Sequence, residues 1–304
     1  MRRVEIAEGK FLDIKREEKV RFEDFVLEYL EYAKVNKRSW KRDARSLKLL
    51  GRSFNGKLLH EINPQMIEKY KAERLNQVKG STVNRELACL KHLFNLAIRW
   101  GRAHTNPMKE IRLFRESPAR IRYLTKPEIT KLLSTSSDFL KPILITALHT
   151  GMRMGEILRL KWEDIDFERG IIEVTETKSG EPRKIPMNNL LTETLRSIKL
   201  PCVSPYVFCR TDGRPRKSIR TAFENALKRA GIENFRFHDL RHTFASHLVM
   251  AGADLPTVKE LLGHKTIEMT MRYAHLSPDH KRVWVEALVQ RMDTKGKIEK
   301  SEVA

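Results

Sequence analysis

Helical periodicity runs along most of this 304-residue chain but stops between residues 106 and 123. That stretch carries Pro107 and Pro118, and its apolar residues follow neither the helical nor the strand period. Proline inside a helix removes a backbone hydrogen bond, so the stretch is suited to joining two helical units. Chains of about 300 residues commonly divide into two domains, each with its own core. We therefore predict one domain at residues 20–105 and another at 124–292, with a basic linker at 106–123 between them.

The first of these domains has the pattern of a small helical bundle. Amphipathic patterns begin near Phe22, Trp40, Pro64 and Gly80, with apolar residues recurring at i, i+3, i+4 and i+7. Asn63 and Pro64 form a typical helix start, because asparagine caps free backbone N–H groups and proline fits the first helical position. Four helices in about 85 residues predict an all-α domain.

One helix of this domain carries a basic stripe away from its apolar side. The stripe consists of Arg38, Lys41, Arg45, Lys48 and Arg52. Such a face is either simply solvated or bound to phosphates. The chain has 59 Lys and Arg against 39 Asp and Glu, a net charge of +20, which favours double-stranded DNA as the partner. Arg120 and Arg122, at the end of the linker, are further candidates for contacts to the DNA backbone.

The composition excludes several classes of protein. No apolar run approaches the roughly 20 residues that span a bilayer, so we expect no membrane partner. Residues 1–19 form a polar leader without the apolar segment of a secretory signal, which predicts a cytoplasmic protein. Residues 293–304 are a polar tail that we expect to be mobile. Cys89, Cys202 and Cys209 have neither disulfide nor zinc-ligand spacing and are interpreted as ordinary thiols.

The second domain is expected to be mainly helical with one β element. Thr125 and Glu128 form a capping box that begins its first helix. Residues 171–187 have β-branched residues on both sides of Ser179-Gly180, which predicts a β-hairpin with Lys178 at its tip. The expected fold class is therefore mainly α with a small β-hairpin or sheet element (α+β).

Two helical segments of this domain carry side chains suited to phosphate chemistry. In TGMRMGEILRLKWEDID, Arg153 and Glu156 stand three apart, which places them on one helical face. In FRFHDLRHTFASHLVMAG, His238 and Arg241 have the same spacing. Taken singly, an i,i+3 Arg/Glu pair is usually a surface ion pair, and a lone histidine on a helix is more often structural than catalytic.

A third segment, LLGHKTIEMTMRYAHL, carries His264 and Tyr273. Gly263 is expected to end a short helix, which leaves His264 at a turn with its ring held by a rigid frame. Tyr273 follows nine residues later. A single tyrosine in such a position would most often be a packing residue with its hydroxyl at the surface.

Together these motifs resemble the tyrosine recombinase family, also called the phage integrases. The motifs are ALHTGMRMGEILRLKWEDID, Lys178 in a hairpin, HDLRHTFASHL, LLGH and RYAHLSP, in the family's order. Met152 stands where leucine is more usual, which leaves the chemistry untouched. The resemblance implies an N-terminal four-helix core-binding domain followed by a tyrosine recombinase catalytic domain, as in Xer-like two-domain recombinases.

The resemblance implies site-specific recombination of DNA through a 3′-phosphotyrosine intermediate. Tyrosine has a pKa of about 10 and must lose its proton as it attacks, while negative charge grows on the phosphate. We assign Tyr273 as nucleophile, Arg153 and Arg241 as ligands of the non-bridging oxygens, His264 as a further donor, Lys178 as general acid, His238 as base or proton shuttle, and Glu156 as a brace. The phosphotyrosyl bond keeps the energy of the phosphodiester, so no ATP, metal or other cofactor is expected.

The family resemblance also implies an assembly of four protomers on two specific DNA sites, which exchange strands through a Holliday junction. Residues 280–292 are expected to pack either on their own domain or on a neighbouring protomer. The resemblance points to a prokaryotic or mobile-element protein associated with the nucleoid. The target sequence, the direction of the reaction (integration, excision or dimer resolution) and an accessory directionality factor stay open.

Two other functions fit some of these residues. A type IB topoisomerase shares the cleavage chemistry but relaxes supercoils without a partner site. A non-catalytic DNA-binding regulator would have no need of an attacking tyrosine together with the arginines, lysine and histidines, so the full set favours the enzyme.

Overall fold

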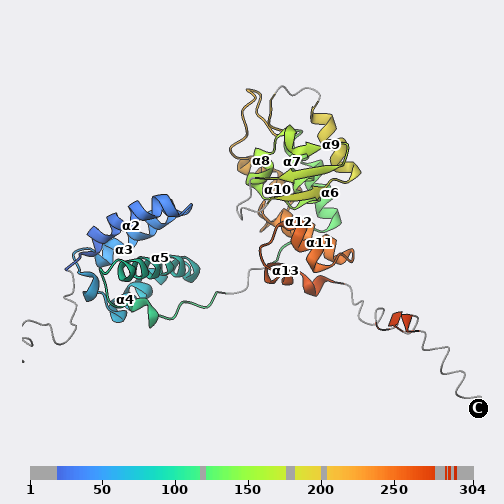
Figure 1. Ribbon diagram of the computed structural model, residues 1–304. Coiled ribbons are helices and arrows are strands. Elements are labelled where there is room, and N and C mark those ends of the chain that lie inside the picture. The colour runs from blue at the N-terminus through green and yellow to red at the C-terminus, as the bar shows by residue number, and fades with distance from the viewer. Residues whose placement is uncertain are drawn as a thin grey trace, which may run out of the picture. The chain divides into compact units, whose positions relative to one another are not determined.

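The computed structural model describes residues 19–116, 121–175, 182–199 and 204–277, together with residues 285, 287, 288, 291 and 292. These residues are mainly helical and include one small antiparallel sheet, so the predicted fold class is confirmed (Figure 1). The chain divides into two compact units, Met1–Ala119 and Arg120–Ala304. Across the described ranges, no helix has the length and apolar character needed to cross a membrane. The predicted tail and all of the predicted leader except Lys19 lie outside the described residues.

The first unit contains the predicted helices. They are α2 (Phe22–Asn36), α3 (Trp40–Phe54), α4 (Pro64–Leu75) and α5 (Gly80–Arg99). Asn63 caps α4 as expected, since its side chain accepts a hydrogen bond from the backbone N–H of Met66 at 3.0 Å. Helix α5 packs against the other three, and the apolar faces of all four meet in one core.

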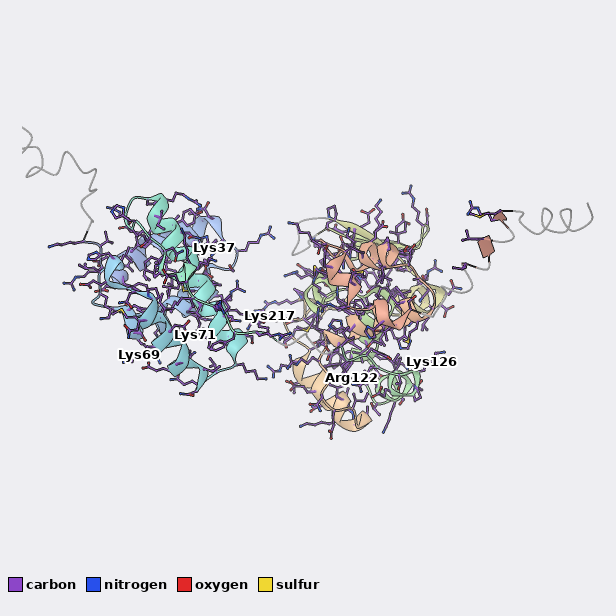
Figure 2. All side chains as sticks on the ribbon, turned by 90° about the horizontal axis from the view of Figure 1, so that it is seen from below. Lys37, Lys69, Lys71, Arg122, Lys126 and Lys217 are labelled. Atoms are coloured by element: carbon purple, nitrogen blue, oxygen red, sulfur yellow. The ribbon has the colours of Figure 1, made fainter. Side chains whose placement is uncertain are left out.

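The first part of the predicted linker belongs to this unit. Residues 106–116 lie against it, with Met108 and Ile111 buried in its core. Lys71, labelled in Figure 2, lies over the ring of Phe114 at 4.9 Å from its centre. The sequence did not reveal this packing, because apolar residues that dock singly onto a preformed surface leave no periodic pattern.

The second unit begins with the predicted capping box, in which the Thr125 hydroxyl and the Glu128 carboxylate each accept from the other's backbone N–H. Its helices are α6 (Lys126–Ser134), α7 (Leu140–Thr150), α8 (Met154–Arg159), α9 (Asn189–Lys199), α10 (Arg220–Ala230), α11 (Asp239–Met250), α12 (Leu255–Leu262) and α13 (Glu268–Met271). Helix α7 is the centre of this unit and packs against α6, α8, α9 and α11.

The predicted hairpin is present as two antiparallel strands, β2 (Ile171–Val174) and β3 (Arg183–Pro186). A two-residue strand that was not predicted, β1 (Ile165–Asp166), pairs with the other side of β2. Ile172 and Ile185 face each other in the register and are both buried. Lys178, expected at the hairpin tip, lies outside the described residues.

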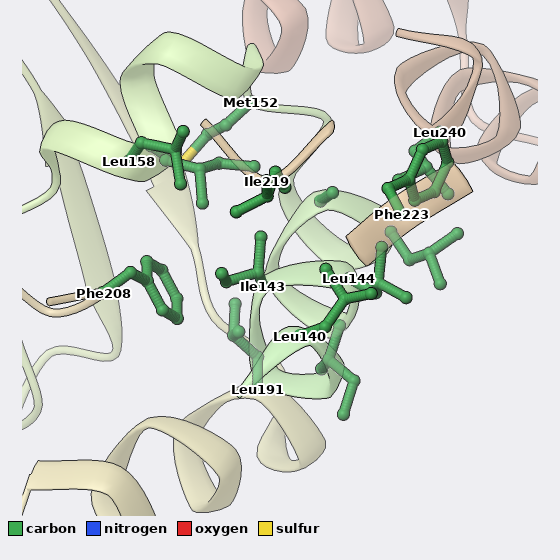
Figure 3. Close-up of a cluster of buried hydrophobic side chains, with 14 of the residues drawn as sticks. Leu140, Ile143, Leu144, Met152, Leu158, Leu191, Phe208, Ile219, Phe223 and Leu240 are labelled. Atoms are coloured by element: carbon green, nitrogen blue, oxygen red, sulfur yellow. The ribbon is translucent and has the colours of Figure 1, made fainter. Parts of the chain in front are cut away.

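The core of the second unit forms around α7. Leu140, Ile143 and Leu144 are fully buried along one helix. Figure 3 shows them beside Leu191 of α9 and Leu240 of α11. Because the helix is held on several sides, the residues that follow its C-terminal end are placed firmly.

Gly151 ends α7 in a left-handed conformation with φ of 62°. A Cβ atom at this position would lie 2.5 Å from Cδ1 of Phe244 and 2.8 Å from Cδ2 of Leu262. Both the backbone conformation and the close approach of α11 and α12 therefore require glycine.

We expect Gly151→Ala to lower the free energy of unfolding by about 2–4 kcal/mol, from left-handed strain together with overpacking. Gly155→Ala is the matched control, because the nearest heavy atom to its added Cβ is 3.5 Å away and alanine favours α8. Urea denaturation of the purified proteins measures both. Equal stability of the two variants would contradict the role given to Gly151.

Candidate active site

The sequence predicted that Arg153 lies within a helix, on one face with Glu156. In the structure Arg153 lies just before α8 (Met154–Arg159). It is the N-cap residue, with extended backbone angles of φ −73° and ψ 149°. Glu156 holds it twice: its carboxylate accepts from the Arg153 backbone N–H at 2.9 Å and from the guanidinium Nη1 at 2.8 Å. The Arg153 side chain keeps 25% of its surface exposed, so the guanidinium is braced and still accessible.

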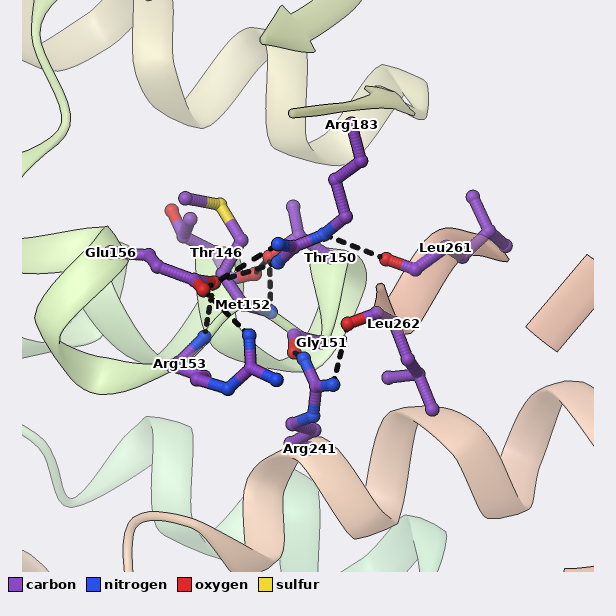
Figure 4. Close-up of polar contacts among 10 residues, drawn as sticks. All are labelled: Thr146, Thr150, Gly151, Met152, Arg153, Glu156, Arg183, Arg241, Leu261 and Leu262. Carbon is purple, nitrogen blue, oxygen red and sulfur yellow. Dashed lines mark hydrogen bonds and ion pairs between the residues drawn. The ribbon is translucent and has the colours of Figure 1, made fainter. Parts of the chain in front are cut away.

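Arg183 is a second partner of Glu156 and was missed by the sequence reasoning. Its Nη2 lies 2.7 Å from the Glu156 carboxylate, and its Nε donates to the Leu261 carbonyl at 3.1 Å (Figure 4). The two side chains are 6% and 3% exposed. The signal was present in the alternation of β3, because Arg183 shares the inward face with Ile185.

The two arginines control the charge of Glu156. Burial alone would raise the pKa of this carboxyl, but the hydrogen bonds from Arg183 and Arg153, together with the positive charge of Arg183, more than offset that effect. The pKa is lowered overall, so Glu156 is an anion at neutral pH. One buried carboxylate thus serves two guanidinium groups.

Arg241 lies in the first turn of α11 and is only 3% exposed. Its Nη1 donates to the Gly151 carbonyl at 2.7 Å, and its Nη2 donates to the Leu262 carbonyl at 2.5 Å (Figure 4). Burial and the positive charge of Arg153 lower its pKa to about 9, which leaves the guanidinium charged at neutral pH. Arg241 therefore ties the end of α7 to the end of α12.

His264 follows Gly263, which ends α12 in the left-handed conformation with φ of 61°, as the sequence predicted. The Nδ1 atom lies 2.8 Å from the hydroxyl of Thr270. Burial and the charges of Arg241 and Arg153 lower the pKa of His264 to about 3, so the ring is neutral at pH 7. When Thr270 donates to Nδ1, the hydrogen is on Nε2, which suits a donor toward an anionic oxygen.

Tyr273 is buried, with 1% of its surface exposed. It packs in a small cluster with Phe244, Val258 and Leu262. Its hydroxyl lies 2.5 Å from Nδ1 of His242. Burial raises the pKa of the Tyr273 hydroxyl, although nearby arginines oppose the rise.

The histidine bonded to Tyr273 is therefore one that the sequence reasoning did not select. His238, the residue named there, is the N-cap of α11 and is exposed, with its ring perpendicular to that of His242 at 5.3 Å between centres. The spacing held a clue, because residues four apart share a helical face.

The other selected residues lie elsewhere or outside the described chain. Lys178 and Arg120 are not among the described residues. Arg122 pairs with Glu128 and lies 5.7 Å from the ring centre of Phe235, so its charge is engaged within the second unit.

The basic stripe is exposed on the first unit, along and just before α3: Arg38, Lys41, Arg45, Lys48 and Arg52. Among described residues, no group of three or more His, Cys, Asp or Glu is placed to hold a metal ion.

Comparison with known proteins decides the family. Residues 122–280 match the Phage integrase family, and residues 18–115 match the Phage integrase N-terminal domain. The chain belongs to the phage integrase family. Arg153, His238, Arg241, His264 and Tyr273 all fall within the matched catalytic segment.

Named relatives include a recombinase and a putative integrase. The chain is 32% identical to the shufflon-specific DNA recombinase of Escherichia coli, over 78% of this chain and 62% of that protein. It is 31% identical to a putative integrase of Pseudomonas phage Pf1, over 76% of this chain and 68% of the phage protein. The chain thus spans less than two thirds of the shufflon recombinase, whose further residues have no counterpart in the alignment.

Solved structures share the fold. A Tn1549 transposon integrase in complex with transposon right end DNA has a TM-score of 0.76 at 20% identity, covering 89% of this chain and 100% of that one. A lambda integrase dimer bound to a core site has a TM-score of 0.73 at 23% identity, covering 82% and 97%. At these identities the likeness concerns the fold alone.

We expect Arg183→Met to lower the free energy of unfolding by about 3–5 kcal/mol, because it removes one partner of a buried carboxylate while keeping an apolar side chain of similar length. Lys184→Ala is the matched control, since its pair with Glu173 is 65% and 49% exposed and contributes less than about 1 kcal/mol. Adding Glu156→Gln to Arg183→Met should recover part of the loss. Urea denaturation measures the loss of stability in each variant. Equal losses in Arg183→Met and Lys184→Ala would show that the pair of Arg183 with Glu156 does not stabilise the protein.

Proposed function

We propose that this chain is a site-specific DNA recombinase that cuts and rejoins strands through a 3′-phosphotyrosine bond to Tyr273. The observation that carries the proposal is the set of hydrogen bonds by which Arg183 and Arg241 hold the Arg153 segment against the end of the helix before His264. Tyr273 lies in the same unit, where Arg241 is close enough to affect its pKa. The recombinase and integrase names of its relatives support the same reaction.

The charges suit a phosphoryl transition state. Arg153 and Arg241 would bind the two non-bridging oxygens, because a planar guanidinium matches a pair of phosphate oxygens. His264 would donate a further hydrogen bond from Nε2. Negative charge that grows on the phosphate during attack would then meet donors already fixed in place, which is the largest source of rate enhancement in many enzymes.

Two proton transfers accompany the reaction. The hydroxyl of Tyr273 loses a proton as its oxygen bonds to phosphorus, and the departing 5′ oxygen gains one. Lys178 is the proposed general acid, since an ammonium can give up its proton and an arginine can hardly do so. By family resemblance, His238 is the expected base or proton shuttle for Tyr273. Because the phosphotyrosyl bond keeps the energy of the phosphodiester, the proposed reaction requires neither ATP nor a metal ion.

The proposed assembly is a homotetramer on two duplex sites. A lambda integrase tetramer bound to a Holliday junction has the same fold, with a TM-score of 0.71 at 23% identity. The first unit would act as the core-binding domain, with the basic stripe of α3 on the DNA backbone. Relatives from bacteria and phages support a prokaryotic cytoplasmic location near the nucleoid. An accessory factor would set the direction of the reaction.

A type IB topoisomerase activity is the second candidate, because nicking and religation by Tyr273 would also relax supercoils. A recombinase requires two sites, whereas relaxation requires one. Incubating the protein with supercoiled plasmids that carry one or two copies of its selected site separates these functions by their products.

The central prediction is that Tyr273→Phe binds DNA with near-normal affinity and forms no covalent adduct. Loss of the phenolic oxygen removes one hydrogen bond, worth about 1 kcal/mol of stability, but it also removes the nucleophile. The assay uses a nicked suicide duplex built on the site that the wild-type protein selects from a random-sequence pool. Denaturing electrophoresis and peptide mapping identify the adduct. An adduct formed by the variant, or one mapping to Tyr206 in the wild type, would refute the assignment.

A second prediction concerns the leaving group. Lys178→Ala should slow cleavage of the ordinary duplex by at least about 100-fold, yet have little effect when sulfur replaces the bridging 5′ oxygen, since a thiolate leaves without a proton. Lys184→Ala, from the same hairpin, controls for general loss of positive charge. Equal defects on the two substrates would mean that Lys178 binds DNA and does not act as an acid.

A third prediction tests the basic stripe of α3. Arg45→Ala/Lys48→Ala should lower the slope of log affinity against log salt by about 1.8, because each lost phosphate contact contributes about 0.9. Arg122→Ala serves as comparison and should change the slope less, because Arg122 is already paired with Glu128. Fluorescence anisotropy across a salt series measures both. An unchanged slope in the double variant would remove this stripe from the interface.

A further inference from the structure

We propose that His242 is the residue that takes the proton from Tyr273 during cleavage and returns it during ligation. This inference rests on the proposed recombinase function and assigns the base to a different residue from His238. It makes His242 a catalytic residue, because its ring touches the reacting oxygen.

The first argument is contact. Nδ1 of His242 lies 2.5 Å from the Tyr273 hydroxyl, and the centres of the two rings are 5.8 Å apart. Tyr273 is 1% exposed, so the apolar residues around it exclude bulk water from most of the side chain. A proton leaving this hydroxyl therefore has an acceptor already in hydrogen-bond contact.

The second argument is position on the helix. His242 directly follows Arg241, the guanidinium anchored by two backbone carbonyls. Both residues belong to the first two turns of α11, so one rigid element places the proposed phosphate ligand and the proton acceptor together. His238, by contrast, is exposed at the start of this helix, which suits a group that meets the DNA phosphate when the duplex arrives.

The third argument is protonation. Burial and the neighbouring His238 lower the pKa of His242 to about 4, so its ring is neutral and able to accept at pH 7. The charged or titratable groups that influence or adjoin this ring are His238, Asp239, Arg241, His264, Arg272 and Tyr273. A bound phosphate would offset the positive charges among them and raise the basicity of His242 toward the range where general bases act well.

The atoms balance in both directions. In cleavage the O–H bond of Tyr273 breaks, its oxygen bonds to phosphorus, and the proton moves to Nδ1 of His242 while the P–O5′ bond breaks. The leaving oxygen takes its proton from the general acid proposed above. In ligation the 5′ hydroxyl gives its proton back to the deprotonated general acid and attacks phosphorus. The P–O bond to Tyr273 breaks, and protonated His242 returns its proton to the phenolate oxygen.

The experiment compares His242→Asn with His238→Asn on the nicked suicide duplex, in single-turnover conditions from pH 6 to pH 9. Asparagine retains a hydrogen-bonding group but cannot accept a proton at these pH values. We expect His242→Asn to cleave at least about 100-fold more slowly at pH 7, with a rate that rises about tenfold per pH unit as hydroxide replaces the base. His238→Asn should keep the pH profile of the wild type, whatever its rate.

A second measurement guards against misfolding. His242→Ala leaves a space for exogenous imidazole, which should restore part of its cleavage rate and have no such effect on His238→Ala. A steep pH profile or imidazole rescue in the His238 variants would overturn the inference and make His238 the base. Cleavage by His242→Asn at a rate within threefold of the wild type would also overturn it. A wild-type protein that forms no adduct would overturn the proposed function, and this inference with it.

Discussion

The structure of the second unit depends on one buried carboxylate among three guanidinium groups. Glu156 pairs with Arg153 and Arg183, while Arg241, within the part of the chain that the structure describes, bonds to backbone carbonyls alone. Burying a guanidinium without a carboxylate costs free energy, which is expressed in the lowered pKa of Arg241. The cluster therefore holds more positive than negative charge, and a phosphate diester would supply the missing anion. The same excess of positive charge that lowers the stability of the free protein would increase its affinity for DNA.

Burial, together with nearby positive charge, sets the protonation state of the histidines. His264 and His242 both lie near the arginines, and both have their pKa lowered well below neutrality. Neutral rings can donate from one nitrogen and accept at the other, whereas protonated rings only donate. Burial therefore keeps each histidine able to accept a hydrogen bond or a proton, and the positive charge of the arginines, which would bind the phosphate, adds to this effect.

The sequence predicts what is local and misses what is distant. Caps at Asn63 and Thr125, the hairpin and the turn before His264 were found because a few adjacent residues determine each of them. Arg183 was missed because its contact with Leu261 spans 78 positions. The contact between His242 and Tyr273 spans 31 positions, and spacing alone offered two histidines on one helix face without choosing between them. Resemblance to a family supplied the proposed catalytic residues, but only packing places a particular ring on the tyrosine.

Helix ends connect the fold to the site. Gly151 and Gly263 both end their helices in left-handed conformations. The last turn of a helix leaves backbone carbonyls without hydrogen-bond donors. The Arg241 guanidinium supplies donors to two such carbonyls, those of Gly151 and Leu262. Arg241 is then at once a C-terminal cap for α7 and α12 and the proposed phosphate ligand. A phosphate that drew the guanidinium toward itself would have to share it with these carbonyls. If Arg241 has the proposed role, one side chain would couple binding of DNA to the packing of the two helix ends.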